Sequence, residues 1–359
     1  MAKIDIKKAE ADYLKKLKEE GLTVSVSRIQ QYRKCHQAHY YKYVLKLTRK
    51  LKGSALQRGS ALHECLEYYY QGKSWKKSWL QFKEEFFKTH FPEEIAELGD
   101  IPQLVYNLME NYVECYEDEE LEYIETELEF NVPLVKEENI NIIGFIDFLA
   151  RDSRGILIGE TKTHKNFPDY DVRLFNTQSA LYAWVIKDQL KLFPNERVDR
   201  ILWNYIRAKD PSTPRILKDG NISRTKLDST PFTVKKFLKE NGLKDKDYQE
   251  LIDAQSFDNY FRRDIVSINK NVVATILEDT RETAKQILHN PLVKDKNINK
   301  MNCNYCDYKN LCQAQLCDPD ADIDFMIKAD FEIRERKEED NGKGKKGNNK
   351  KSKKQKFRR

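Results

Sequence analysis

The sequence predicts an α/β fold, and three observations support this class. Alternating apolar and polar residues predict strands at 124–130 and 141–149, and the apolar run at 156–158 is typical of a buried strand. A helix over 171–187, with apolar residues on one face, then precedes a fourth strand at 198–206. Helical spacing dominates on both sides of this block. The order is therefore helices, three antiparallel strands, a helix and a strand.

The chain divides into four predicted regions. Residues 1–124 are mainly helical, and Ser25 marks the start of one helix because its hydroxyl can cap free backbone N–H groups. Residues 125–210 form the α/β core, and residues 211–332 form a second helical region. Residues 333–359 are expected to be a disordered basic tail, since their low-complexity sequence cannot build a core.

Composition and charge predict a cytoplasmic protein with a basic arm. Hydrophobic residues make up 40% of the chain, which is enough for a sizeable core. The longest uncharged stretch, 174–186, is shorter than the ~20 residues of a membrane span, and the charged N-terminus does not resemble a secretory signal. Residues 341–359 hold ten Lys or Arg and no acid. The net charge of the whole chain is +6, so residues 1–340 carry a net charge of −4. We interpret this tail as an arm for nucleic-acid phosphates, with a solubilising tail as the alternative.

Cysteine spacing predicts a metal or cluster site near the C-terminus. In Cys303-x2-Cys306-x5-Cys312, a tight turn can present two thiolates together, and the third follows from the next turn. A fourth ligand is required, and both the neighbouring Cys317 and the distant Cys35 are candidates. Spacing alone leaves zinc and an iron–sulfur cluster open.

Two carboxylates and a lysine are concentrated in the strand block. Asp147 lies in GFIDFL, while Glu160 and Lys162 lie in ILIGETKT. Positions 160 and 162 point to the same face of a strand. Carboxylates from neighbouring strands can bind a divalent cation such as Mg²⁺, and a lysine beside it can help activate an attacking water. The alternative interpretation is a solvated turn acid beside a surface ion pair.

Three further polar residues are candidates for the same site. Gln178 and Tyr182 lie four residues apart on one helix face, where they could reach a phosphate or a base. An amphipathic helix with a half-buried tyrosine would show the same spacing. His63 lies in GSALHECLEYYY, far upstream, and a lone histidine is more often structural.

Taken together, these segments resemble the RecB-like branch of the PD-(D/E)xK nuclease superfamily. That branch includes AddB-type recombination nucleases and CRISPR spacer-acquisition nucleases with an iron–sulfur cluster. The resemblance spans about residues 24–317 and rests on six segments: VSVSRIQQYRKC, RGSALHECLE, GFIDFL, GETKT, QSALY and CNYCDYKNLC. It implies a restriction-endonuclease-like core, a mixed sheet flanked by helices. Helical N- and C-terminal additions would be tied together by the cluster.

The resemblance also implies roles for individual residues. Lys162 would position and polarise the nucleophilic water, and Gln178 and Tyr182 would contact the nucleic-acid backbone. The implied ligands of a catalytic Mg²⁺ or Mn²⁺ are His63, Asp147, Glu160 and the backbone carbonyl of Thr161. The implied ligands of a 4Fe–4S cluster, with zinc as the alternative occupant, are Cys35, Cys303, Cys306 and Cys312. Three cysteines would remain ordinary thiols: Cys65, Cys115 and Cys317.

Some features depart from the family pattern or refine it. His36 follows Cys35 where the family usually has proline, and no GxxxxGK[ST] phosphate loop is present, so any helicase would be a separate partner. The segment WNYIRAKDPSTPRILKDG resembles phage-encoded members. Its basic residues could track a phosphate backbone: Arg207, Lys209 and Arg215.

These expectations combine into one functional prediction. The chain is predicted to be a metal-dependent DNA exonuclease that acts on linear ends or single strands in recombination, repair or phage DNA metabolism, in the host cytoplasm if phage-encoded. A recombinase or helicase is a possible partner. The alternatives are a single-strand or flap endonuclease, a spacer-acquisition accessory nuclease, and a non-catalytic DNA-binding module.

Overall fold

The structure is a computed structural model, and it describes residues 5–168, 175–218, 221–223, 226–318 and 320–334. The predicted arm at 341–359 lies outside these residues, as does the first part of the helix predicted over 171–187. Within the described ranges, none of the helices is long and apolar enough to cross a membrane.

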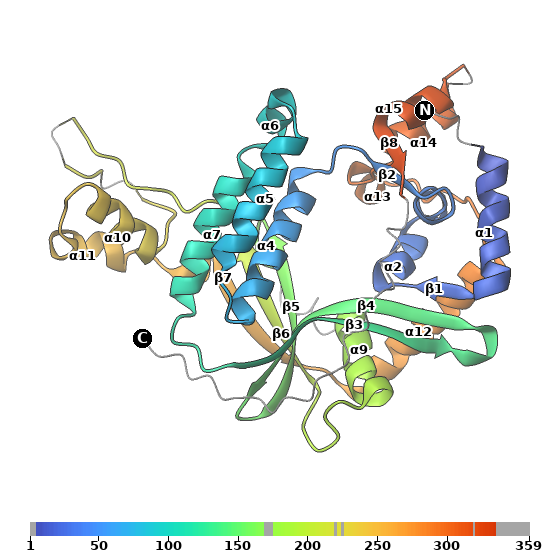
Figure 1. Ribbon diagram of the computed structural model, residues 1–359, viewed down its shortest axis with the longest axis horizontal. Coiled ribbons are helices and arrows are strands. Elements are labelled where there is room, and N and C mark those ends of the chain that lie inside the picture. Colours follow the sequence, from blue (N-terminus) through green and yellow to red (C-terminus); the bar gives the residue numbers. More distant parts are fainter. Residues whose placement is uncertain (1–4, 169–174, 219–220, 224–225, 319, 335–359) are drawn as a thin grey trace.

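A six-stranded mixed sheet forms the centre of the fold (Figure 1). Its strands are β1 (Leu22–Val24), β3 (Glu122–Val135), β4 (Ile140–Asp152), β5 (Gly155–His164), β6 (Arg200–Arg207) and β7 (Phe261–Ser267). The pairs β3–β4, β4–β5 and β6–β7 are antiparallel, whereas β1–β4 and β5–β6 are parallel. The predicted mixed sheet flanked by helices is therefore confirmed. Strands β1 and β7 were not predicted from the sequence.

Strand β4 has a gap along one of its edges. On that edge β1 pairs with residues 140–142 and β5 pairs with residues 148–152. Strand β3 follows the other edge from residue 140 to residue 151. No described strand therefore pairs with residues 143–147 on the first edge, and β4 and β5 diverge where this gap begins.

Helices cover both faces of the sheet (Figure 1). On one face, α4 (Ser54–Tyr70) and α7 (Ile101–Cys115) pack against the sheet, and α5 (Trp75–Thr89) and α6 (Pro92–Leu98) form an outer layer on them. The other face packs against α2 (Val26–Lys34), α9 (Thr177–Trp184) and α12 (Lys270–His289). A π-helical turn, Val185–Leu190, continues α9. The core is thus two apolar layers, one on each side of the sheet.

Segments from both ends of the chain pack together beside the sheet (Figure 1). The helices of this region are α1 (Ile6–Glu20), α3 (His36–His39), α13 (Lys300–Asn304), α14 (Lys309–Cys317) and α15 (Ile323–Asp330). A two-stranded antiparallel sheet joins β2 (Leu47–Arg49) to β8 (Phe331–Ile333). Tyr41 and Tyr308 are in the small apolar core that these elements share.

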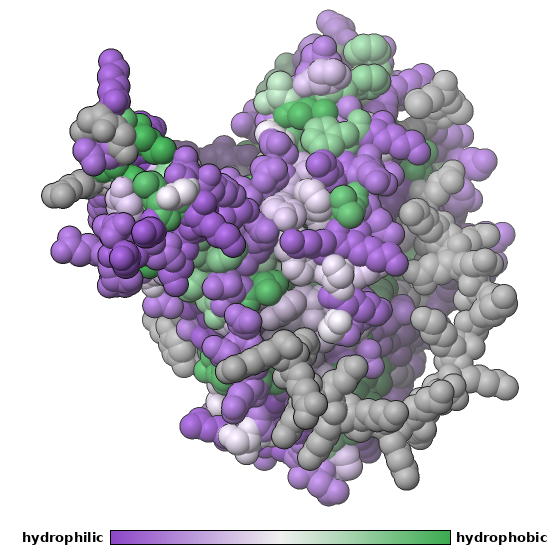
Figure 2. All heavy atoms as spheres, turned by 60° about the vertical axis from the view of Figure 1, so that its left-hand side comes forward, coloured by the Kyte–Doolittle hydropathy of each residue, from purple (hydrophilic) through white to green (hydrophobic). Residues whose placement is uncertain are grey.

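A small lobe lies between β6 and β7 in the chain. It contains α10 (Pro231–Glu240) and α11 (Gln249–Asp253), which enclose their own apolar cluster. The space-filling view shows this lobe projecting from the body, with a mainly hydrophilic surface (Figure 2).

Local sequence explains where several elements begin and end. The Ser25 hydroxyl accepts a hydrogen bond from the Arg28 backbone N–H, which confirms the predicted start of α2. Helix α9 starts later than predicted, because the side chain of Asn176 caps it at Thr177. Strand β3 contains Pro133 and continues to Val135. An edge strand tolerates proline, since its outer backbone groups have no strand partner.

Candidate active site

Asp147 and Glu160 flank the point where β4 and β5 diverge. The last residue pair that joins the two strands is Phe148 with Gly159, so Asp147 and Glu160 are the first residues beyond it. Gly159 is required for this close approach, because a Cβ atom there would lie 2.2 Å from the Phe148 ring. The backbone N–H of Thr161 donates to Asp147 Oδ2 at 2.7 Å. The backbone of β5 thus fixes the orientation of the β4 carboxylate.

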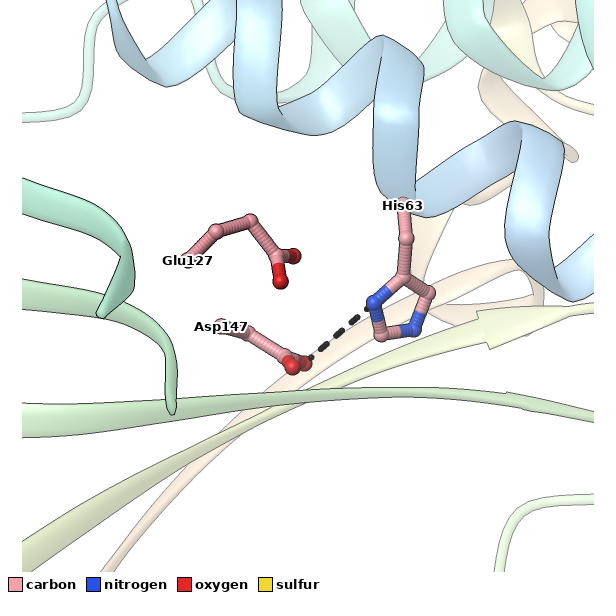
Figure 3. A group of neighbouring side chains, drawn as sticks. All are labelled: His63, Glu127 and Asp147. Atoms are coloured by element: carbon pink, nitrogen blue, oxygen red, sulfur yellow. Dashed lines mark ion pairs between the residues drawn. The ribbon is translucent and has the colours of Figure 1, made fainter. Parts of the chain in front are cut away.

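His63 and a third carboxylate, Glu127, complete a group of potential metal ligands. One ligand atom from each of His63, Glu127 and Asp147 lies within 4.8 Å of the others. The three side chains point into one space beneath α4, from three different elements (Figure 3). His63 Nδ1 lies 3.6 Å from Asp147 Oδ2. This donor set, two carboxylates and an imidazole, suits a divalent cation such as Mg²⁺ or Mn²⁺.

Glu127 was not among the residues predicted from the sequence. Glu125, Glu127 and Glu129 alternate with less polar residues, a pattern that indicates the solvent-facing side of an edge strand. In the hairpin, the pairs on either side of Glu127 place it opposite Asp147. Its φ is +48°, a conformation that non-glycine residues rarely adopt. Only the register of the hairpin identifies which of the three acids faces the site.

Glu160 and Lys162 lie side by side on β5. Glu160 is only 2% exposed, and one of its oxygens forms an ion pair with Lys162 Nζ. The other oxygen, Oε2, is buried and has no hydrogen-bond partner among the described residues. An unpaired buried carboxylate oxygen is costly. It is therefore a further position suited to a cation, although Glu160 is outside the group of three described above.

The pKa values of these acids are shifted toward the neutral form. Burial raises the pKa of Asp147 to about 6. Burial, together with the charge of Asp147, raises the pKa of both Glu127 and Glu160 to about 7. Burial lowers the pKa of His63, while the negative charge of Glu160 and a hydrogen bond to the Thr161 backbone oppose this shift. A divalent cation would favour the ionised acids and a neutral imidazole, which are the forms that bind metals.

A chain of hydrogen bonds links Lys162 to α9 and back to β4. Lys162 Nζ donates to Gln178 Oε1 at 3.2 Å, and Gln178 Nε2 donates to the Tyr182 hydroxyl at 2.7 Å. That hydroxyl donates to the backbone carbonyl of Phe145 at 2.6 Å, within the unpaired edge of β4. Tyr182 is 4% exposed, so in this structure it positions its neighbours.

A buried polar network supports the same part of β5 from the opposite face. Asn204 on β6 is fully buried, and its side-chain amide donates to Thr161 Oγ1 at 3.2 Å. Its oxygen accepts from the Tyr112 hydroxyl at 3.0 Å and from Arg263 Nε at 3.3 Å. Thr161, which links Glu160 to Lys162, is thereby held on both its backbone and its side chain.

Comparison with known proteins places this geometry in a family. Residues 23–313 match the model of the PD-(D/E)XK nuclease superfamily. The chain belongs to this superfamily. Membership indicates a nuclease that uses a divalent metal ion, and the residues gathered at the β4–β5 divergence fit that requirement.

Other comparisons add little to this assignment. The crystal structure of SSO0001 is similar over 87% of this chain and 97% of that chain, with 14% sequence identity and a TM-score of 0.33. That degree of similarity carries no argument about activity. Among curated proteins, no significant sequence match was found.

The four cysteines implied as cluster ligands line one cavity of this nuclease. Cys35, Cys303, Cys306 and Cys312 border a space of about 170 Å³ between the N- and C-terminal segments, and all four are free thiols. No three thiols among the described residues lie within 4.8 Å of one another. The exposed Cys317 does not line the cavity.

The basic residues at the end of β6 are engaged in ion pairs. Arg207 and Lys209 contact Asp228 at 2.8 and 2.6 Å, respectively. Arg215 is exposed. The predicted phosphate-tracking role would therefore require Arg207 and Lys209 to exchange an existing carboxylate partner for a phosphate.

Proposed function

We propose that this nuclease is a metal-dependent deoxyribonuclease that degrades DNA from its ends. The observation that carries the proposal is the convergence of His63, Glu127 and Asp147, next to the buried Glu160 and its partner Lys162. The preference for DNA ends rests on the RecB-like motifs of the sequence. The same motifs suggest a role in recombination, repair or phage DNA metabolism, with any helicase or recombinase supplied as a separate partner.

The residues of the site have separable tasks in this proposal. His63, Glu127, Asp147 and Glu160 would hold Mg²⁺ or Mn²⁺, with the Thr161 carbonyl adjacent. When bound, the ion would draw charge from the phosphate and acidify the attacking water. Lys162, which Glu160 and Gln178 orient, would donate a hydrogen bond to that water and offset the charge that develops on the phosphate.

We further infer that the cysteine cavity holds a 4Fe–4S cluster. The inference is supported by four free thiols around one space, which is the number of cysteine ligands that a 4Fe–4S cluster takes. When bound, the cluster would crosslink the segment around Cys35 to the segment from Cys303 to Cys312. Constraints that close such long loops have the largest entropic effect on the unfolded chain.

The activity can be tested with end-labelled linear DNA and covalently closed circular DNA, each single- and double-stranded, using protein purified without oxygen. With Mg²⁺ or Mn²⁺ we expect linear DNA alone to be degraded, and no degradation with EDTA. Cleavage of circles would contradict the exonuclease proposal and indicate an endonuclease. Degradation of RNA but not DNA would contradict the assignment of DNA as the substrate. No cleavage of any nucleic acid would contradict the whole proposal.

A further inference from the structure

Phe145 lies on an open face of the β3–β4 hairpin, two residues from Asp147. The residues on either side of it face the core: a Cβ atom on Gly144 would strike the Phe130 ring, and Ile146 is buried. Because side chains alternate along a strand, Phe145 points to the other face, which it shares with Asp147. Its side chain is 50% exposed.

The ring of Phe145 is half exposed and is not part of the apolar core. It is outside the four apolar clusters of the structure, and no described aromatic ring or cation contacts it. Its cross-strand neighbour, Glu129, is exposed, as are Asn131 and Pro133 further along the hairpin. Single exposed apolar residues are common, so the position of this one beside the metal ligands is what matters.

The backbone of Phe145 is firmly held. Its carbonyl accepts the hydrogen bond from Tyr182, whose hydroxyl in turn accepts from Gln178, the partner of Lys162. The backbone that carries the aromatic ring is therefore joined to the Lys162 side chain by one hydrogen-bond chain. Two residues of strand span roughly 7 Å, so the ring lies within reach of the base of a nucleotide whose phosphate is at Asp147.

We propose that Phe145 is a stacking platform for an unpaired nucleobase next to the scissile phosphate, and that the substrate enters as single-stranded DNA or a frayed end. This inference rests on the proposed function. An aromatic ring with no hydrogen-bonding group stacks on any base, whereas a paired base within a duplex does not offer its face. The exposed carboxylate of Glu129 beside the ring disfavours a phosphate there, which leaves the base as the group that fits.

The test uses single-stranded oligonucleotides in which one abasic residue is moved stepwise past the cleavage site. In the wild type, one position of the abasic residue should raise KM about ten- to a hundredfold, with little change in kcat. Phe145→Ala should raise KM by a similar factor on the intact oligonucleotide. Its KM should not rise further when the abasic residue is at that position. Phe145→Trp should restore the wild-type pattern. Phe91→Ala, which removes an exposed phenylalanine directly before α6, should behave as wild type.

A binding measurement separates this inference from the proposed function. The fluorescence of 2-aminopurine, placed at the sensitive position, should be quenched by the wild type and by Phe145→Trp but not by Phe145→Ala. If Phe145→Ala melts at the wild-type temperature and matches the wild type in quenching and KM, the stacking role is wrong while the nuclease assignment stands. If the wild type cleaves no DNA, the proposed function fails, and the quenching result still decides the role of Phe145.

Discussion

Glu127 has an unfavourable backbone conformation that its location helps to explain. A non-glycine residue at positive φ costs on the order of 1 kcal/mol or more, and such strain tends to occur at functional sites. Here the strained residue faces Asp147 and lies within ligand distance of His63. The positive φ departs from regular strand geometry at the residue whose carboxylate joins Asp147 and His63. We therefore treat Glu127 as part of the metal site.

Glu127→Gln should weaken metal binding because it removes one of the carboxylates around the ion. We expect the Mg²⁺ concentration needed for half-maximal cleavage to rise by about 10- to 100-fold. Glu129→Gln is the matched control, since it removes an exposed acid two residues along the same strand. A metal titration of cleavage checks this. Equal titration curves for the two variants would exclude Glu127 from the site.

The raised pKa values of the acids predict how metal binding depends on pH. The pKa of Asp147 is raised to about 6 and that of Glu127 to about 7. Both carboxylates therefore bind protons more tightly in the folded than in the unfolded chain. Their protonated forms therefore stabilise the fold at low pH, and this contribution is lost as the pH rises through about 6 to 7. A cation must displace these protons. The increase in melting temperature caused by Mg²⁺ should thus be small near pH 5.5 and grow toward pH 8, measured against EDTA. A larger effect at low pH would contradict this account.

At the scale of elements, the site depends on how β4 and β5 separate. Phe148 and Gly159 form the last pair before Asp147 and Glu160, and the Phe148 ring occupies the space that a side chain on residue 159 would need. The strands therefore diverge directly after Gly159, where the absence of a side chain lets the backbone pack against the Phe148 ring.

Gly159→Ala should destabilise the protein and reduce cleavage. Overpacking of this kind costs about 1–3 kcal/mol in the free energy of unfolding, and moving β5 would displace Glu160. Gly53→Ala is the control, because nothing lies within 4 Å of a Cβ atom there. Denaturant unfolding and a cleavage assay measure both effects. A Gly159→Ala variant as stable and active as Gly53→Ala would show that this packing does not matter.

The elements that were predicted correctly are those with local signals. The alternation in β3 and β4 and the hydroxyl cap at Ser25 are visible in the sequence, and so are the strands that carry Asp147 and Glu160. Strand β1 has only three residues, too few for a periodic pattern, and β7 is enclosed by helical sequence. The role of Glu127 depends on the pairing of two strands, and the Asn204 network depends on residues far apart in the chain. Neither has a signal in the local sequence.

At the scale of the whole molecule, the N- and C-terminal segments depend on each other. Strand β2 pairs with β8, and the Tyr308 hydroxyl donates to the Leu47 carbonyl. The cysteine cavity lies between these segments. A cluster in that cavity would add a covalent constraint to a small apolar core, and so hold one side of the molecule together.

A 4Fe–4S cluster would give the purified protein a brown colour and bound iron. Cys306→Ser should remove both. It should also lower the free energy of unfolding by about 2–5 kcal/mol, as the loss of a long-range crosslink does. Cys317→Ser, which changes an exposed thiol outside the cavity, should leave both unchanged. Iron and zinc analysis with thermal unfolding provides the measurement. A stable, colourless wild type that contains zinc would contradict the cluster.

The central claim is that the residues at the β4–β5 divergence hydrolyse DNA with a divalent metal. Its most direct test compares wild type with Lys162→Ala on end-labelled single-stranded linear DNA, with Mg²⁺ and with EDTA, after both proteins are shown to melt alike. We predict that the wild type degrades the DNA only with Mg²⁺, and that the variant binds the DNA but cleaves it at least about 100-fold more slowly. Cleavage by the variant at the wild-type rate, or cleavage in EDTA, would contradict the account.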